Sequence, residues 1–331
     1  MDIRAELLLA ETAEVDKITE QLRHSLRSNL HKRGYVVALS GGVDSSVCAA
    51  LAVKAVGPKK VFALLLPEKD SSGNSSLLGK KLAEQLRIEY EYFDIAPTLE
   101  AIGCYKQRDQ AIRRIFPDYT SDWKSKIAIS GGQEGQFNHF NLIVQNPDGE
   151  LLEERMGLNE YLEVVAATNY KQRIRKTVEY FHADRLNYAV IGTPNRLEYD
   201  QGFFVKNGDG AADIKPIAHL YKTQVYALAR HLELPVEICE AVPSTDTYSL
   251  VQGQDEFYFA LPYDKMDIAL WGHNHNVSID ELSETLGISN EQSKRIYNDI
   301  EMKRKTTASL HWKPLLIEPV NGPLTKPALS K

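Results

Sequence analysis

Apolar runs alternate with helix-like segments from residue 34 onward. Four short runs are predicted strands, of which the first is expected to be buried: YVVAL (35–39), VFALLL (61–66), YEYFDI (90–95) and YAVIGT (188–193). Segments with helical spacing of apolar residues lie between and after them: 45–56, 77–88, 171–186 and 220–232. Strands that alternate with helices predict a parallel sheet with right-handed crossovers. We therefore expect a doubly wound α/β fold.

Two further helices are indicated near the C-terminus, at 278–287 and 289–305. Ser278 precedes the first of them, and either Ser289 or Asn290 precedes the second. Short polar side chains at these positions satisfy free backbone amides at a helix start, so they predict N-caps.

Between about 108 and 165 the alternation breaks down. IAIS (127–130) and NLIVQ (141–145) are strand candidates, and Pro147-Asp148-Gly149 is a turn signal. We expect an inserted hairpin or flap here, rather than a helix-bearing part of the sheet. The loop ISGGQEGQ (129–136) is interpreted as a hairpin turn, since no Asp and no clear helix follow its glycines. A second phosphate site is the alternative. The whole chain of 331 residues is otherwise predicted to form one domain.

Composition and charge narrow the class of protein. The net charge of −6 disfavours general nucleic-acid binding. No apolar run approaches the ~18 residues of a membrane span. The first 22 residues resemble an amphipathic helix more than a signal peptide. Three scattered cysteines without a CxxC motif argue against a disulfide framework or zinc site. We expect a cytoplasmic protein that binds neither nucleic acid nor membranes.

The stretch SGGVDSS (40–46) follows the first strand and precedes a helix rich in small residues. Amides of a glycine-rich turn at a helix start suit a phosphate, and glycines let the backbone approach it closely. Asp44 is poorly placed to hold phosphate directly, but it suits a Mg²⁺ ion between itself and the phosphates. The stretch is neither GxxxxGK[ST] nor GxGxxG, which disfavours a P-loop and a redox dinucleotide site. A plain turn with a serine cap is the structural alternative.

SGGVDSS resembles the pyrophosphate-binding loop of the N-type ATP pyrophosphatases. A second segment, GTPNRLEYDQGFFVKNGDGAADIKPIAHLYKTQ (192–224), is similar to the signature of the NAD synthetase family within that group. NYKQRIR (169–175), the segment from Pro243 and the loop LPEKDSS (66–72) also resemble that family. Met302-Lys303-Arg304 departs from the His-Lys-Arg that is frequent in the family.

The resemblance implies a role for each matching residue. The implied ATP contacts are Ser40, Gly41, Gly42, Asp44, Ser45, Ser46, Lys69, Thr193 and Ser244. The implied contacts with the dinucleotide substrate are Asn169, Arg173, Lys206 and Asp213. Asp44 and Glu198 are expected to hold Mg²⁺. Asp209 and Lys222 are expected at the reacting carboxyl, with Asp209 accepting a proton from ammonium.

The implied reaction is ATP-dependent amidation of nicotinate adenine dinucleotide (deamido-NAD) to NAD through an acyl adenylate. ATP and Mg²⁺ are the implied cofactors, and the family resemblance implies a homodimer. The first strand begins near residue 35, leaving no room before it for a fused glutaminase, so free ammonia is the expected nitrogen donor. A separate glutaminase subunit is the alternative supplier. A paralogous ATP-pyrophosphatase amide ligase with another carboxylate or amine, and a non-catalytic nucleotide-binding protein, are the alternative functions.

Overall fold

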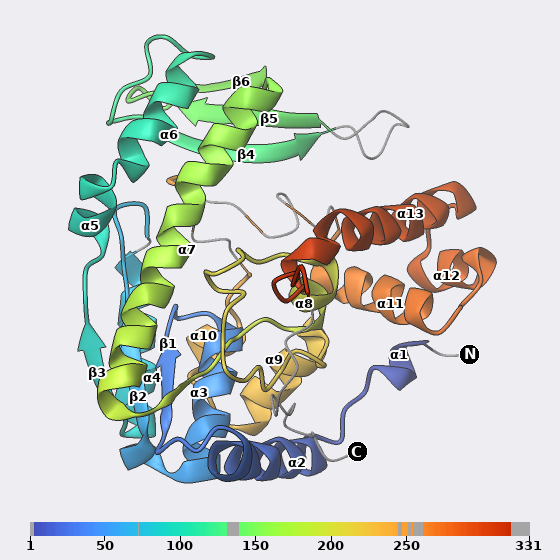
Figure 1. Ribbon diagram of the computed structural model, residues 1–331. Helices are drawn as coiled ribbons and strands as arrows, with labels where there is room; N and C mark the ends of the chain where they lie inside the picture. The colour runs from blue at the N-terminus through green and yellow to red at the C-terminus, as the bar shows by residue number, and fades with distance from the viewer. Residues whose placement is uncertain are drawn as a thin grey trace.

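The computed structural model describes residues 3–71, 73–130, 139–243, 247–250, 253, 258 and 261–318. Its central feature is a parallel sheet of order β3-β2-β1-β7 (Figure 1). The strands are β1 (Tyr35–Ala38), β2 (Val61–Leu65), β3 (Glu89–Tyr92) and β7 (Ala189–Val190). All four lie where the apolar runs predicted them. The parallel pairing confirms the expected α/β class.

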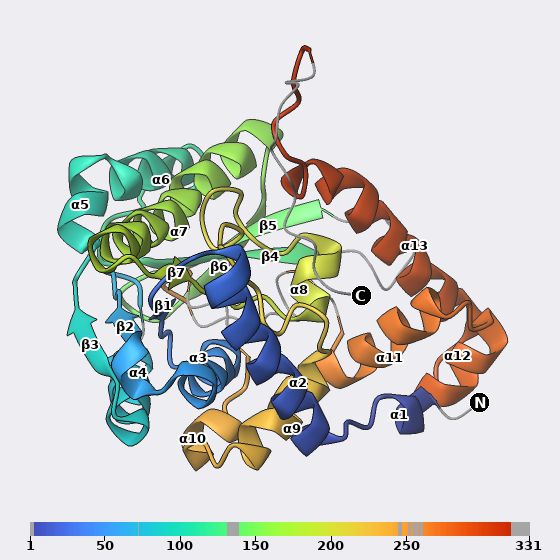
Figure 2. The ribbon, with the colours of Figure 1, turned by 60° about the horizontal axis from the view of Figure 1, so that its bottom comes forward.

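Helices cover both faces of this sheet, as a doubly wound fold requires (Figure 2). One face packs against α2 (Glu11–His24), α3 (Val43–Val56), α4 (Gly73–Leu86), α9 (Lys222–His231) and α10 (Val236–Cys239). The other faces α5 (Ala96–Ala101), α6 (Cys104–Arg113) and α7 (Leu158–Leu186). Because successive strand residues point to opposite faces, Val37 packs in the first layer and Val36 in the second.

The predicted insertion forms a second sheet at the far end of α7 (Figure 1). It is antiparallel, with order β4-β5-β6, and consists of β4 (Lys124–Ser130), β5 (His139–Gln145) and β6 (Leu151–Arg155). The expectation of a simple hairpin was therefore wrong by one strand. LLEER (151–155) gave no strand signal because its side chains are mostly exposed and acidic, so apolar alternation is weak.

Helices also enter the insertion, contrary to expectation. α6 runs to Arg113 and α7 begins at Leu158, and both pack on the small sheet through a common apolar cluster. β4 pairs antiparallel with β5. The turn predicted over 129–136 falls mostly on residues 131–138, which lie outside the described residues. Pro147-Asp148-Gly149 does connect β5 to β6, as its turn signal predicted.

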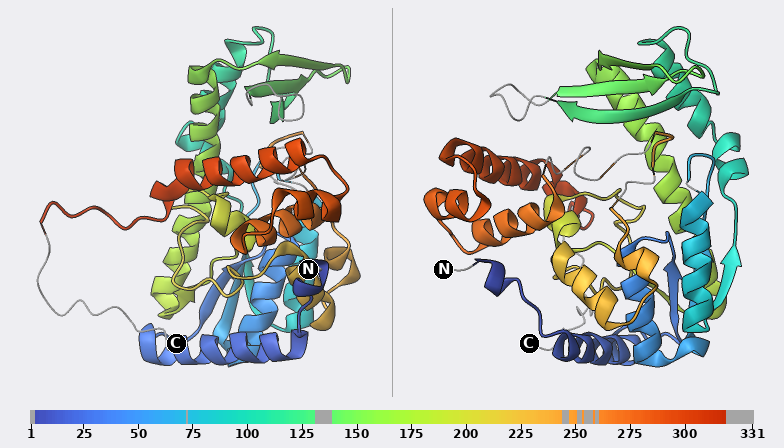
Figure 3. Two further views of the ribbon diagram at one scale, coloured as in Figure 1. Left: turned by 90° about the vertical axis from the view of Figure 1, so that its right-hand side faces the viewer. Right: turned by 180° about the vertical axis from the view of Figure 1, so that it is seen from behind.

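The C-terminal helices form a third group beside the parallel sheet (Figure 3). They are α11 (Tyr263–Asn274), α12 (Ile279–Leu286) and α13 (Asn290–Thr307), and the short helices α1 (Ile3–Glu6) and α8 (Arg196–Gln201) pack against them. The side chains of Ser278 and Ser289 cap α12 and α13, confirming both N-cap predictions. The helix expected over residues 1–22 is instead split into α1 and α2. No helix of the described ranges has the length and apolar content needed to cross a membrane.

Candidate active site

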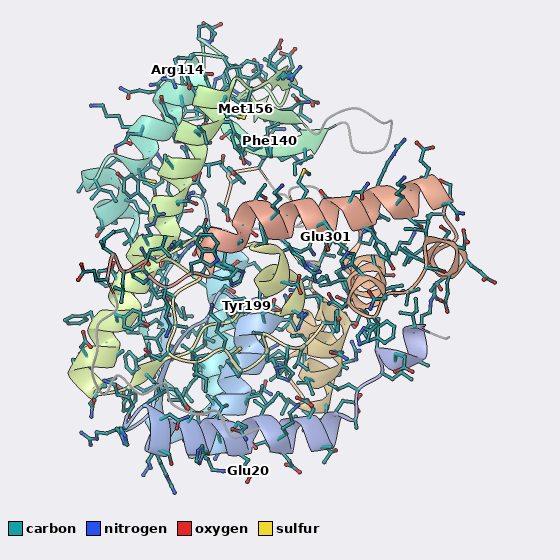
Figure 4. All side chains as sticks on the ribbon, turned by 45° about the vertical axis from the view of Figure 1, so that its right-hand side comes forward. Glu20, Arg114, Phe140, Met156, Tyr199 and Glu301 are labelled. Atoms are coloured by element: carbon teal, nitrogen blue, oxygen red, sulfur yellow. The ribbon has the colours of Figure 1, made fainter. Side chains whose placement is uncertain are left out.

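A cavity of about 1220 Å³ opens at the carboxyl end of β1 and extends to the inserted sheet. β1 lies between β2 and β7, where the strand order changes direction, and ligands of open parallel sheets bind at such a point. The loop between β1 and α3 forms one wall, α7 and α13 form others, and Ile129 and Phe140 of the inserted sheet close the far end. In Figure 4, Phe140 lies on that sheet above α13.

The loop after β1 has the shape that an anion site needs. Gly41 has φ +78°, and a Cβ there would lie 2.5 Å from the carbonyl oxygen of Ser75, so only glycine fits without strain. Ser40 Oγ and Ser45 Oγ lie 3.2 Å apart, and Ser46 Oγ donates to the Gly42 carbonyl at 2.8 Å. Ser40, Gly41, Gly42 and Ser45 line the cavity, while Ser46 is buried behind them.

Two carboxylates stand beside this loop and share one asparagine. Asn195 Nδ2 donates to Asp44 Oδ1 at 3.0 Å, and the backbone amide of Asn195 donates to Glu198 Oε2 at 3.1 Å. Asn195 Oδ1 in turn accepts the Glu198 amide at 3.2 Å, completing a capping box on α8. Burial, followed by the charge of Asp44, raises the pKa of Glu198 to about 7. The helix cap thus fixes two like charges near each other.

Lys222 faces Asp44 from the first turn of α9. Its Nζ donates to Asp44 Oδ2 at 2.5 Å, and the side chain is buried. Burial alone would lower the pKa of Lys222, but the charges of Asp44 and Glu198 outweigh it and raise the pKa. Lys222 is therefore a permanent cation beside the phosphate loop.

Asp267 of α11 holds the start of α9 from behind. Its carboxylate accepts the backbone amides of Lys222 at 3.1 Å and Thr223 at 2.7 Å. Free amides of a first helical turn need such an acceptor. Burial raises the pKa of Asp267 to about 7, although these hydrogen bonds oppose the shift. Asp267 ends the segment from Pro243 that resembles the family, but no role was predicted for it, because its partners are backbone amides of a helix distant in sequence.

Asp209 lines the cavity from the loop after α8, and its Oδ1 accepts the Val205 amide at 2.7 Å. Burial raises the pKa of Asp209, and the charge of Lys176 opposes that rise. Lys176 and Glu179 of α7 are a buried pair, with Nζ and Oε2 2.7 Å apart, and they line the same cavity. Their pairing was not predicted, because lysine and glutamate three positions apart also typify an exposed helix face.

The predicted substrate residues separate into two groups. Asn169 and Arg173 of α7 line the cavity together with Lys206, and Arg173 Nε donates to the Lys206 carbonyl at 3.2 Å. Asp213 is exposed and is not among the lining residues. Its carboxylate accepts the Val190 amide at 2.7 Å and the Tyr180 hydroxyl at 3.4 Å, so it fixes the loop to the end of β7.

The predicted ATP residues divide similarly. Thr193 lines the cavity. The backbone amide of Lys69 instead donates to the Tyr105 hydroxyl at 3.3 Å, and the Lys69 side chain lies over the Tyr105 ring. Lys69 is not among the lining residues. Ser244 lies outside the described residues.

A buried ionic network holds the loop after β2, and sequence analysis missed it. Lys171 Nζ contacts Glu68 Oε1 at 2.9 Å and Asp70 Oδ2 at 2.7 Å, and Arg108 pairs with Asp70 at 2.5 Å. All four side chains are nearly inaccessible to solvent. Because buried charges are stable only when paired, this network fixes the position of the loop.

The carboxylates of Asp44 and Glu198 suit a divalent cation. Hard carboxylate oxygens are the ligands that Mg²⁺ prefers, and Mg²⁺ commonly takes only one or two of them and completes its shell with substrate phosphates and water. Their mutual repulsion, visible in the raised pKa of Glu198, would be relieved by a cation between them. Within the described ranges, no group of three or more His, Cys, Asp or Glu side chains is arranged to hold a metal. Two carboxylates fit an ion whose other ligands are phosphates and water.

Comparison with known proteins gives consistent results. A family model described as NAD synthase matches residues 14–116 and 142–307. The chain is 57% identical over 315 residues to the NH(3)-dependent NAD(+) synthetase of Rhizobium meliloti (strain 1021), covering 95% of this chain and 94% of that one. It is 36% identical over 301 residues to the NH(3)-dependent NAD(+) synthetase of Thermotoga neapolitana, covering 90% and 97%.

Among solved structures, the chain resembles the NH3-dependent NAD synthetase from Campylobacter jejuni, with TM-score 0.62 and 22% identity. That comparison covers 94% of this chain and 100% of the other, and at this identity it shows the fold alone. β4 lies in residues 117–141, which the family model leaves unmatched.

Proposed function

The chain belongs to the NAD synthase family, and we propose that it catalyses ATP-dependent amidation of deamido-NAD by ammonia. The observation that carries this proposal is the contact of Lys222 with Asp44 beside Glu198, at the mouth of the glycine loop. That arrangement provides a fixed cation, a pair of oxygen ligands and free helix amides around one point, which adenylate formation from ATP requires.

In the first half-reaction, a carboxylate oxygen of the nicotinate ring attacks the α-phosphorus of ATP. The bond from the α-phosphorus to the bridging oxygen breaks, and pyrophosphate leaves with the electron pair. We propose that the amides of the Ser40–Ser45 loop hold the departing pyrophosphate and that Lys222 neutralises charge on the phosphoryl oxygens. Asp44 and Glu198 would hold Mg²⁺, which supplies further neutralisation when bound.

In the second half-reaction, ammonia attacks the carbonyl carbon of the adenylate, the bond to the AMP oxygen breaks, and the nitrogen loses a proton. Because ammonium dominates at neutral pH, the incoming nitrogen must also be deprotonated before it attacks. We propose Asp209 as the acceptor, since its half-buried carboxylate lines the same cavity.

The remaining residues are proposed to bind and position the substrates. Asn169, Arg173 and Lys206 would contact the dinucleotide, and Thr193 would lie near the adenosine. Asp213 and Lys69 would act through the loops that they fix, because neither is among the residues lining the cavity. Ser244, which lies outside the described residues, is proposed as a further ATP contact. We further propose a cytoplasmic homodimer, which sedimentation velocity tests.

Incubation with deamido-NAD, ATP, Mg²⁺ and ammonium chloride tests the proposal, with nucleotides separated by chromatography. Equal amounts of NAD and AMP are expected, with pyrophosphate released. AMP formed only with another acid would instead indicate a paralogous ligase, and no cleavage of ATP would indicate a binding protein. Replacing ammonium with glutamine tests whether the chain itself releases ammonia from glutamine, and no NAD is expected.

A further inference from the structure

One side of α7 lines the cavity over most of the length of the helix. The lining residues are 161–162, 165, 168–169, 172–173, 175–176 and 179. Their spacing of three or four positions places them on one side of the helix, and at 1.5 Å per residue they extend over about 27 Å. Figure 1 shows α7 running from the parallel sheet to the inserted sheet. The helix therefore forms a continuous wall between the two ends of the cavity.

The chemical character of this wall changes along the helix. Lys176 marks the end near the proposed reacting groups, because its charge holds down the pKa of Asp209. Arg173 and Asn169, the proposed dinucleotide contacts, follow along the same wall, and Val165 lies one further turn toward the inserted sheet. From Lys176 to Val165 the distance along the helix axis is about 16 Å. An extended dinucleotide has this length, with its charged phosphates in the middle and an aromatic ring at each end.

The apolar end of the cavity carries a pair of stacked aromatic rings. Phe140 of β5 and Tyr161 of α7 lie with ring centroids 3.9 Å apart and planes 16° apart, and neither side chain is fully buried (Figure 4 labels Phe140). Ile129 of β4 lies directly opposite Phe140 in the strand register and lines the same cavity. Leu162, another lining residue, is 52% exposed. A flat aromatic surface of this kind stacks a nucleic base, since every base has a π face.

The proposed reaction brings two adenines to the cavity, one in ATP and one in deamido-NAD. The phosphates of ATP are assigned to the glycine loop, and the loop after β2 also resembles a segment of the family. That loop meets α7 at Arg175, which donates from Nε to the Leu66 carbonyl at 3.0 Å and from a terminal nitrogen to Ser71 Oγ at 3.2 Å. Arg175 lies about 15 Å along the helix axis from Val165, whereas Asn169 is one turn from it. The stacked rings therefore continue the dinucleotide contacts.

We propose that the stacked rings of Phe140 and Tyr161 bind the adenine of deamido-NAD, the end remote from the reacting carboxyl, and so select the dinucleotide over nicotinate mononucleotide. This inference rests on the proposed function, because it takes Asp209 and Asn169 to mark the reacting end and the middle of the substrate. Phe140 lies in residues 117–141, which the family model leaves unmatched. The inserted sheet thereby contributes a specificity-determining side chain to the reaction.

Three variants of the full chain test this inference. Phe140→Leu removes the ring but keeps an apolar side chain, and we expect the KM for deamido-NAD to rise about tenfold, the size of effect that one stacked base has. The KM for ATP and kcat should change less than about twofold, as at positions without a contact. Phe140→Tyr keeps the ring and should retain the wild-type KM for deamido-NAD. Phe116→Leu is the matched control, because Phe116 packs in the same apolar cluster but is not among the lining residues. It should lower the melting temperature and leave both KM values unchanged.

Nicotinate mononucleotide, which lacks the adenine, distinguishes binding of the base from a general effect on the cavity. The wild type should have a kcat/KM at least about tenfold lower for the mononucleotide than for deamido-NAD, because binding of a remote group supports the reaction. Phe140→Leu should lower kcat/KM for deamido-NAD and not that for the mononucleotide.

Three results would overturn the inference. They are an unchanged KM for deamido-NAD in Phe140→Leu, equal losses with the two nucleotide substrates, and a KM that rises for ATP alone. The last result would assign the rings to the adenine of ATP. Failure of the wild type to form NAD would instead overturn the proposed function, so the two failures are distinguishable.

Discussion

Lys222 Nζ lies 2.5 Å from Asp44 Oδ2, although 178 positions separate the two residues along the chain. Each begins a helix that follows a different part of the sheet: Asp44 lies in the first turn of α3 and Lys222 in the first turn of α9. The contact therefore exists only when α3 and α9 pack together, and it places cation, carboxylate and helix amides at one point.

Lys222→Met should lower kcat at least about a hundredfold, because a preorganised donor at a site of developing charge contributes that much. Steady-state formation of NAD measures the effect. Lys17→Met, which removes an exposed lysine paired with Glu14, is the matched control and should retain full activity. A Lys222→Met enzyme within threefold of wild type would show that the ammonium takes no part in the reaction.

Glu198→Gln should raise the Mg²⁺ concentration for half-maximal activity roughly tenfold, because fewer anionic oxygens weaken binding of a hard cation. Without Mg²⁺, the same variant should melt at a higher temperature than wild type, since burial and the charge of Asp44 both disfavour an ionised Glu198, and Gln carries no charge. Activity measured against Mg²⁺ and thermal unfolding in EDTA provide the two readouts. Unchanged dependence on Mg²⁺ would contradict Glu198 as a ligand.

Lys171→Met should cost about 3–5 kcal/mol of unfolding free energy, the usual effect of leaving buried partners unpaired. Glu68 and Asp70 both lose their ammonium partner, which lies in a site almost without solvent. Urea denaturation measures the loss. Lys81→Met breaks the exposed pair with Glu237 and should change stability by less than about 1 kcal/mol. Adding Glu68→Gln to Lys171→Met should recover part of the loss, and strict additivity would argue against a coupled network.

Asp267→Asn should change how stability depends on pH. The folded pKa of Asp267 is about 7, above its unfolded value of about 4, so the folded state binds the extra proton. Asp267 therefore adds to the free energy of unfolding of the wild type below about pH 4, and this contribution is lost as pH rises through about 7. Asn cannot titrate, so the melting temperature of wild type relative to Asp267→Asn should fall across that window. A constant difference between pH 4 and 8 would contradict the raised pKa.

Local sequence features predicted the parallel sheet and the glycine loop because both depend on neighbouring residues. YVVAL followed by SGGVDSS places a buried strand, a tight turn and a helix start in immediate succession. Residues that the family resemblance supplied, such as Lys222 and Glu198, do line one cavity with that loop. Their roles stay predictions until the reaction is measured.

The features that the sequence did not reveal depend on distant partners. Lys171 lies in a segment that resembles the family, but its buried pairing with Glu68, more than a hundred positions away, is not evident from the sequence. Asn195 orients both carboxylates through a helix cap, but its contact with Asp44 follows only from the packing of α8 near α3. The third strand, β6, forms through pairing with β5 despite an exposed, acidic sequence. Periodicity within one segment carries no information about such partners.

Lys176→Met should move the acid limb of the pH–rate profile for ammonium to higher pH. Lys176 holds down the pKa of Asp209, which burial raises, so loss of its charge lets that pKa rise further. If Asp209 must be ionised to accept the proton, a higher pH is then needed to reach the same rate. The profile is obtained by measuring kcat/KM for ammonium at saturating ATP and deamido-NAD. The measurements run from about pH 5.5 to about 9, a range that brackets such a limb. Lys176→Arg keeps the charge beside Glu179 and should leave the limb near its wild-type position. An identical profile for Lys176→Met and wild type would show that no carboxylate near Lys176 titrates in the step that consumes ammonium.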